Sequence, residues 1–240
     1  MNKLFPFIII FLTSCSDINT SKTKLKASEK ESIKSENSIE SHFDKSIDVP
    51  KGYKIIGEAT GDLNKDKIEE KVIVYNTDRN EDMGIIREIH IFKKGKSTWE
   101  KWHSSIGAVL PSNHGGMMGD PFEEVKVENG CLVIRQSGGS REKWSYTHRY
   151  RNQNNSWELI GATINYYTPE DFSETLDYNL SNGKISYSKE IDLTYKETPT
   201  ENKNIKLDFI KKLKALPKMH GFYPGNNQIT LPENIGTFYY

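Results

Sequence analysis

Residues 122–136 read Phe-Glu-Glu-Val-Lys-Val-Glu-Asn-Gly-Cys-Leu-Val-Ile-Arg-Gln, and this stretch decides the fold class. Val125 and Val127 alternate with charged residues before Asn129-Gly130, and a largely apolar run follows that pair directly. Strict alternation is the period of a β-strand with one buried face. Asn-Gly is suited to a two-residue hairpin turn, because both central positions need positive φ angles. The stretch therefore predicts an antiparallel β-hairpin.

Similar short runs, rich in β-branched and aromatic residues, occur on both sides of this hairpin and are separated by Gly, Asn and Asp. We expect strands at 54–59, 70–75, 86–92, 141–151 and 157–167. Helical segments do not separate these runs, which favours an antiparallel meander over βαβ units. The predicted fold class is mainly β: an antiparallel meander that is partly propeller-like or sandwich-like.

Near the C-terminus the spacing of apolar residues changes. Four apolar residues recur at helical spacing between Phe209 and Leu216, and Pro217 ends the run. We therefore expect one C-terminal α-helix over about 204–216. The tail at 218–240 is rich in Gly, Pro, Asn and aromatic residues, and we expect it to pack as an irregular cover or a last edge strand.

The first fifteen residues have the features of a lipoprotein signal peptide. Lys3 supplies positive charge, residues 4–12 are almost entirely apolar, and Thr-Ser precedes Cys15. The apolar run is too short to cross a hydrocarbon core about 30 Å thick, so it is expected to be removed. We expect residues 1–14 to be a signal peptide and Cys15 to be lipidated. The alternative is a secretory signal with a chance cysteine.

The segment after Cys15 is dominated by Ser, Lys, Glu, Asn and Asp. So polar a segment cannot bury enough apolar surface to offset the entropy of ordering. We expect a disordered tether over 15–50, followed by one mainly-β domain over 51–240. The lipid would anchor the protein to a membrane of the bacterial cell envelope. Ser16, rather than aspartate, after the cysteine favours the outer membrane in enteric bacteria.

Charge and cysteine content argue against a nucleic-acid partner and against a disulfide within the mature chain. The chain has 33 basic and 33 acidic residues, whereas nucleic-acid binders usually have a basic bias, so we predict no nucleic-acid partner. The chain has two cysteines, and lipidation of Cys15 would leave Cys131 without a partner in the mature chain. The fold would then depend on its core alone. We expect Cys131 to be a small buried side chain.

The segment Gly-Asp-Leu-Asn-Lys-Asp-Lys-Ile-Glu-Glu at 61–70 is the one with the spacing of metal ligands. The Ca²⁺ ligands would be side-chain oxygens and one backbone carbonyl: Asp62, Asn64, Asp66, Ile68 and Glu70. The segment resembles the calcium loop of FG-GAP or VCBS-type repeats, in which such a loop leads into a strand. It departs from that pattern at Lys67, where such loops favour glycine. Ile73 at the twelfth position excludes an EF-hand. The alternative is an Asx-rich turn whose side chains bond their own backbone.

Along 141–151 the odd positions are basic or carry hydroxyl groups, and the even positions from Trp144 to Tyr150 are aromatic. Residues two apart share one face of a strand, so we expect one cationic and one aromatic face. The basic side chains are Arg141, Lys143, Arg149 and Arg151. They form either a platform for an anion or a glycan, or a solvated face behind an aromatic core.

Two other loops are rich in turn-forming residues. The segment 114–122 carries three glycines with His114 and Asp120, and glycines let backbone approach a ligand closely. These two residues are therefore candidates for ligand binding, unless the loop is purely structural. The segment 177–184 begins like the calcium-type loop, but its Asn182-Gly183 favours a hairpin turn.

Four stretches together resemble an uncharacterised family of bacterial exported proteins and lipoproteins: 115–122, 138–144, 157–161 and 177–180. The resemblance spans much of 53–187. It implies an exported protein but brings no activity, so no catalytic residue follows from it.

These observations predict a membrane-anchored envelope lipoprotein with a non-catalytic binding or structural role, whose partner in the envelope is a glycan or a protein. One alternative is an envelope hydrolase with its site in the glycine-rich loop at 114–123, where Glu123 would join His114 and Asp120. The other is a periplasmic immunity or inhibitor lipoprotein.

Overall fold

The computed structural model describes residues 47–191 and 204–240. Within these ranges the chain forms thirteen strands in three antiparallel sheets, together with two short 3-10 helices, η1 (Gly116–Met118) and η2 (Pro232–Asn234). The predicted mainly-β class is therefore confirmed. The signal peptide at 1–14, Cys15 and nearly all of the predicted tether at 15–50 lie outside the described residues. In the described ranges, no helix has the length and apolar character needed to cross a bilayer.

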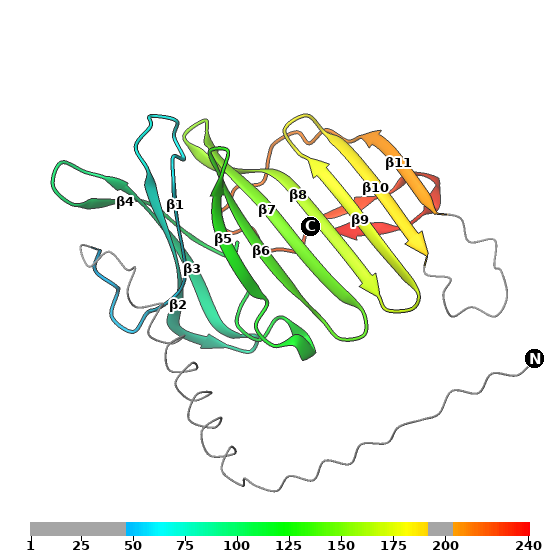
Figure 1. The fold of residues 1–240 in the computed structure, drawn as a ribbon, viewed down its shortest axis with the longest axis horizontal. Helices are drawn as coiled ribbons and strands as arrows, with labels where there is room; N and C mark the ends of the chain where they lie inside the picture. The colour runs from blue at the N-terminus through cyan, green and yellow to red at the C-terminus, as the bar shows by residue number, and fades with distance from the viewer. Residues whose placement is uncertain (1–46, 192–203) are drawn as a thin grey trace, which may run out of the picture. The chain divides into compact units, whose positions relative to one another are not determined.

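Sheet A is a four-stranded meander at the N-terminal end of the described chain (Figure 1). Its strands, in spatial order, are β1 (Lys54–Gly61), β2 (Glu70–Glu81), β3 (Gly84–Lys94) and β4 (Trp99–Ile106). The run Val72-Ile-Val-Tyr75 in β2 is fully buried. Continuous burial of consecutive residues means that both faces of this strand are covered.

Sheet B is a seven-stranded meander in which every strand pairs with its neighbours in sequence. Its strands are β5 (Phe122–Glu128), β6 (Cys131–Gly139), β7 (Lys143–Gln153), β8 (Ser156–Thr168), β9 (Phe172–Asn179), β10 (Lys184–Ile191) and β11 (Ile205–Ile210). The predicted hairpin is confirmed: Glu128 pairs with Cys131, and Asn129 and Gly130 have φ angles of 53° and 74°. The turn at Asn182-Gly183 likewise joins β9 to β10.

The predicted C-terminal α-helix over 204–216 is wrong. Residues 205–210 form β11, which pairs with β10 so that Phe209 lies opposite Ile185 and Leu207 opposite Tyr187. The segment also alternates, with Ile205, Leu207 and Phe209 less exposed than the residues between them. Backbone pairing along β10 and burial of this alternate set favour the strand over the helix that the longer-range spacing suggested.

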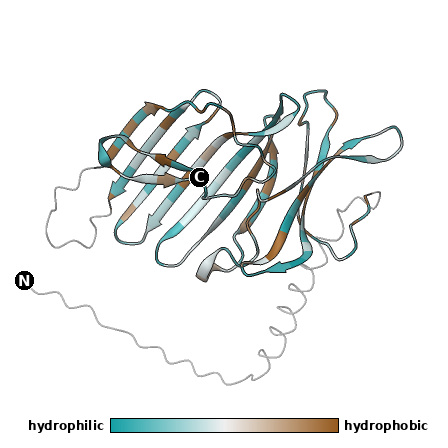
Figure 2. Cartoon of the chain, turned by 180° about the vertical axis from the view of Figure 1, so that it is seen from behind, coloured by the Kyte–Doolittle hydropathy of each residue, from teal (hydrophilic) through white to brown (hydrophobic). Residues whose placement is uncertain are grey.

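The tail at 218–240 covers part of sheet B with a two-stranded sheet of β12 (Gln228–Thr230) and β13 (Thr237–Tyr239). The ring of Phe238 lies 5.2 Å from that of Tyr166 and 5.5 Å from that of Tyr187, centroid to centroid. Tyr240 meets Tyr178 edge-on at 5.7 Å. Figure 2 shows this hairpin in front of sheet B. Phe238 and Tyr240 belong to the same buried cluster as Tyr178 and Tyr187 of that sheet.

One hydrophobic core joins buried residues of sheet A, sheet B, the segment 108–109 and the C-terminal region. At the junction of the sheets, β1 packs directly against β5. A Cβ atom on Gly61 would lie 2.6 Å from Val127 Cγ1, and one on Gly57 would lie 2.7 Å from Phe122 Cζ. Both distances are shorter than real Cβ contacts, so these glycines allow the two sheets to meet.

Candidate functional site

The face of sheet B that points away from the core, called the outer face below, carries polar side chains. Tyr146, His148 and Tyr150 of β7 are buried, whereas Thr147 and Arg149 between them are partly exposed. The predicted period of two along this strand is therefore confirmed. Figure 2 shows the same alternation of hydrophilic and hydrophobic residues along other strands of the sheet.

Strand register arranges these polar residues in rows that cross the sheet. One row, in order from β5 to β11, is Glu124, Arg135, Thr147, Thr163, Asp177, Ser186 and Asp208. A second row, from β6 to β11, is Ser137, Ser145, Asn165, Thr175, Ser188 and Lys206. Hydroxyl and amide groups predominate at the centre of both rows, so the middle of the outer face is hydrophilic without being strongly charged.

Hydrogen bonds connect neighbouring side chains on this face. The Nη1 group of Arg149 donates to Thr163 Oγ1 at 2.9 Å, and that hydroxyl donates to Asp177 Oδ1 at 2.7 Å. In the second row, Thr175 Oγ1 donates to Asn165 Oδ1 at 2.9 Å, and Asn165 Nδ2 donates to Ser145 Oγ at 3.0 Å. These bonds restrict the side-chain rotamers, so the polar atoms of the face are held in place before any ligand arrives.

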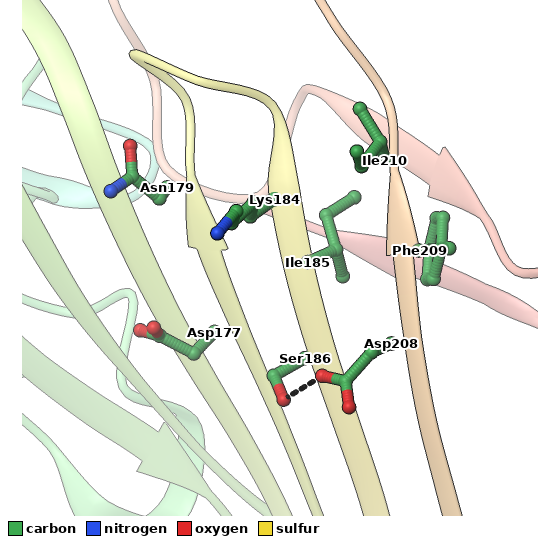
Figure 3. Close-up of a pocket in the computed structure, with 8 residues that line it drawn as sticks. All are labelled: Asp177, Asn179, Lys184, Ile185, Ser186, Asp208, Phe209 and Ile210. Carbon is green, nitrogen blue, oxygen red and sulfur yellow. Dashed lines mark hydrogen bonds between the residues drawn. The ribbon is translucent and has the colours of Figure 1, made fainter.

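A hollow of about 610 Å³ lies over β9, β10 and β11 on this face (Figure 3). Asp177, Lys184 and Asp208 contribute its charged groups, and the Ser186 hydroxyl donates to Asp208 Oδ1 at 2.5 Å. Ile210 at its edge is 65 % exposed. The hollow thus offers acceptors, a cation and an apolar edge within one open surface.

Charges of opposite sign lie next to each other on the outer face. Glu124 contacts both Lys126, at 2.7 Å, and Arg135, at 2.8 Å. The hydrogen bond from Lys126 holds the pKa of the Glu124 carboxyl below its usual range, with Arg135 adding to the effect. Because the cations already have anionic neighbours, this part of the face has no concentrated positive field that would select a polyanion.

The four basic residues singled out in the sequence do not form one cluster. Arg149 donates to Thr163 of the first row, but Arg141 is exposed at the turn before β7. The ammonium of Lys143 donates to the carbonyl oxygen of Ser140 at 3.3 Å, at the end of the strand. The Nη2 and Nε groups of Arg151 donate to Gln153 Oε1 at 2.7 and 2.9 Å. The four basic side chains therefore do not gather at one place, and the hydroxyl and amide side chains form the connected part of the face.

In the glycine-rich loop, Asp120 is bound to an arginine that the sequence pattern did not identify. Its Oδ2 accepts a short hydrogen bond from Arg87 Nη2, and its Oδ1 accepts the Phe122 N–H at 2.9 Å. Arg87 is fully buried and also donates to Asn76 Oδ1 and the Leu110 carbonyl, each at 3.1 Å. Asp120 therefore anchors the loop to the core.

His114, the other candidate in this loop, has a different partner. Its Nδ1 lies 3.2 Å from the Tyr223 hydroxyl, and burial lowers the pKa of its imidazole. His114 and Asp120 therefore have different partners, Tyr223 and Arg87, and these contacts do not support the acid–base pair of the hydrolase hypothesis. In the described ranges, no cluster of three or more His, Cys, Asp or Glu residues is arranged to hold a metal ion.

The 61–70 loop is closed by hydrogen bonds to its own backbone. Asp62 accepts the N–H groups of Lys65 and Lys67 at 2.5 and 2.9 Å, and Asp66 Oδ1 accepts that of Ile68 at 2.7 Å. Lys65 and Lys67 both have left-handed backbones, with φ angles of 66° and 71°. Side chains that bond their own backbone are the feature of the Asx-rich turn, the alternative to a calcium loop.

The two remaining candidate ligands of this loop also bond each other. Asn64 Nδ2 donates to Asp66 Oδ2 and Glu70 Oε1, both at 3.0 Å, while Asn64 Oδ1 accepts the Asp66 N–H at 2.8 Å. Glu70 Oε2 accepts the Leu63 N–H at 2.7 Å. Burial, followed by the nearby Asp66 and Asp62, raises the pKa of the Glu70 carboxyl. Calcium at this loop remains a proposal, and an ion would have to replace the Asn64 amide between two carboxylates.

The thiol of Cys131 is free and buried, as predicted. Burial raises the pKa of this thiol, which makes the reactive thiolate scarce near neutral pH.

In comparisons with protein-family models, curated proteins and solved structures, no match to this chain was found.

Proposed function

We propose that this protein is a lipid-anchored protein of the bacterial cell envelope that binds a weakly charged or neutral glycan through the outer face of sheet B, without catalysis. The observation that carries the proposal is the connected set of hydroxyl, amide and carboxylate groups across β7, β8 and β9. Its central members are Arg149, Thr163 and Asp177, which are joined in one hydrogen-bonded chain.

The chemistry of this face matches that of a polyhydroxyl ligand. Each sugar hydroxyl can donate one hydrogen bond and accept two, so it pairs with surfaces that offer both kinds of group. Thr163 and Asn165 each act here as donor and acceptor. Charged partners such as Asp177 give stronger bonds to hydroxyls than neutral ones do. The intermixed charges favour such a ligand over a nucleic acid or another polyanion.

The anchoring part of the proposal rests on the sequence of the first fifteen residues, which ends at Cys15. Metabolic labelling of the native host with a clickable palmitate analogue tests it. We expect label on the wild-type chain, membrane association, and loss of both in Cys15→Ser. A wild-type chain that stays unlabelled and is released freely into the medium would contradict the anchor.

Co-sedimentation with purified insoluble envelope polysaccharide tests the binding part, using the mature chain with Cys15→Ser so that lipid does not interfere. We expect Asp177→Ala to weaken binding by about tenfold, which corresponds to about 1.4 kcal/mol. Glu81→Ala, which changes an exposed carboxylate on sheet A, is the matched control and should bind like the parent chain. Equal binding by both variants, or none by the parent to any envelope glycan, refutes the proposal. Stoichiometric capture of an envelope enzyme in place of glycan would favour the inhibitor alternative.

A further inference from the structure

A second cavity lies on the opposite side of sheet B from the outer face, where β7 begins and β8 ends. It has a volume of about 290 Å³ and is lined mainly by ring-bearing residues. We call it the aromatic pocket, and its rings are those of His114, Trp144, Tyr146, Tyr166, Tyr223 and Tyr239. They come from the glycine-rich loop, two strands of sheet B and the C-terminal region, so the pocket exists only in the folded chain.

The rings that line the pocket differ in how far they are exposed to solvent. Tyr146 is 8 % exposed and lies deepest, whereas Tyr239 is 44 % exposed. The rings of Trp144 and Tyr146 have centroids 4.9 Å apart with an interplanar angle of 32°. The two rings therefore pack against each other at a tilt, and His148 stacks on Tyr146 as well. Tyr146 thus closes the base of the pocket, and the less buried rings around it are the ones open to a ligand.

Polar atoms accompany these ring faces. The Tyr223 hydroxyl lies 3.2 Å from His114 Nδ1, and the side chains of Tyr146 and Tyr166 are hydrogen-bonded to each other. Asn226 adds an amide to the lining. Within residues 47–191 and 204–240, no Asp, Glu, Lys or Arg lines the pocket, and burial lowers the pKa of His114. At neutral pH the lining is therefore uncharged but rich in hydrogen-bonding groups.

Glycines on two sides give the pocket its shape. A Cβ atom on Gly138 would lie 2.4 Å from Trp144 Cζ2, so a side chain there would displace the tryptophan ring. Gly225 has φ of +86°, and a Cβ atom there would lie 3.2 Å from the Tyr146 hydroxyl. Close backbone approach at these two positions keeps both rings in place.

We propose that the aromatic pocket binds one neutral pyranose ring. The C–H face of a pyranose buries apolar surface against aromatic rings, and its peripheral hydroxyls meet the tyrosine, imidazole and amide groups. The volume is at the lower limit of ligand pockets, about 300 Å³, which fits a single ring and not a longer oligomer. This inference deepens the proposed glycan-binding function and rests on it, because a terminal or branching sugar of the same polymer would enter the pocket.

Saturation-transfer NMR with free monosaccharides tests the inference on the mature Cys15→Ser chain. The probes are glucose, galactose, mannose and N-acetylglucosamine, with choline as a cationic ligand that aromatic pockets also bind. We expect transfer to the ring protons of at least one sugar and none to choline. Tyr223→Phe keeps the ring and removes the hydroxyl, and should weaken sugar binding about threefold or more. Trp144→Ala should abolish it.

The outer-face variant Asp177→Ala separates the two proposals, since it should leave monosaccharide binding unchanged while reducing sedimentation with the polymer. If Trp144→Ala does not fold, Tyr223→Phe alone decides the question. Absence of transfer to every sugar, transfer to choline alone, or sugar binding unaffected by both pocket variants would overturn the inference even if the outer face binds polymer. Loss of polymer binding only in Asp177→Ala would leave the proposed function standing.

Discussion

His148 provides a sharp test of how this core is built. Its side chain on β7 is completely buried, and neither ring nitrogen has a hydrogen-bond partner among the described residues. The ring stacks on Tyr146 at 5.6 Å and meets Phe222 edge-on at 5.1 Å. Burial lowers the pKa of this imidazole to about 3, and the neighbouring Arg149 adds to the effect. The folded protein therefore keeps His148 neutral where the unfolded chain would charge it.

The sign of the pH effect follows from the proton count. Between the usual histidine pKa, about 6.5, and the folded value of about 3, the unfolded chain binds a proton that the native state does not. The free energy of unfolding is therefore highest above this window and falls as the pH falls through it. The loss is about 1.4 kcal/mol per pH unit, or about 2.5 kcal/mol at about pH 4.5. Burial also lowers the pKa values of His90, His103 and His114, so only comparison with a variant isolates His148.

His148→Phe removes this titration and fills the site with an apolar ring. At pH 7 we expect the variant to be about 1 kcal/mol more stable, since it eliminates unpaired buried polar atoms. At about pH 4.5 the gain should grow by about 2.5 kcal/mol, as measured by urea unfolding at both pH values. A stability difference independent of pH, or a variant less stable than the parent at both values, would refute the argument.

Other predictions concern the glycine-rich loop, the junction of sheets A and B, the C-terminal hairpin and the 61–70 loop. For each variant, the change in the free energy of unfolding is measured by urea unfolding. Asp120→Asn leaves the buried Arg87 without its carboxylate, and should cost about 1–2 kcal/mol, less than a fully buried pair, because the Asp120 side chain is 54 % exposed. Gly61→Ala should cost about 1–3 kcal/mol through its clash with β5, and equal stability to the parent would contradict the contact. Phe238→Ala should cost about 3–5 kcal/mol, because the ring packs on two tyrosines of sheet B. Asp62→Ala removes the acceptor of two backbone N–H groups and should cost about 1–2 kcal/mol. It should also abolish any rise in melting temperature on adding Ca²⁺, and a rise that persists would place the ion elsewhere.

Local signals in the sequence predicted β1, β2, β3 and the strands from β5 to β8, but not β4. The turn at Asn129-Gly130 and the alternation along β7 both depend on residues close in the chain, and both are confirmed. The helix predicted over 204–216 was wrong because Phe209 fits a helical pattern and an alternating pattern at once. The choice between them was made by pairing with β10, which a local pattern does not contain.

The sites depended on contacts that no local pattern reveals. Arg87 and Asp120 are 33 residues apart, and His114 and Tyr223 are 109 residues apart. The glycine-rich loop suggested His114 and Asp120 as one site, but each has a different long-range partner. The hydrogen-bonded chain of Arg149, Thr163 and Asp177 likewise joins three different strands, so it appears only in the folded sheet.

Amide chemical-shift mapping with fragments released from the envelope glycan tests the outer face most directly. With isotope-labelled mature Cys15→Ser chain, we predict shifts centred on Thr163, Asp177 and Lys184 that saturate with added fragment. Shifts restricted to sheet A, or a spectrum unchanged by every envelope glycan tried, would contradict glycan binding at this face.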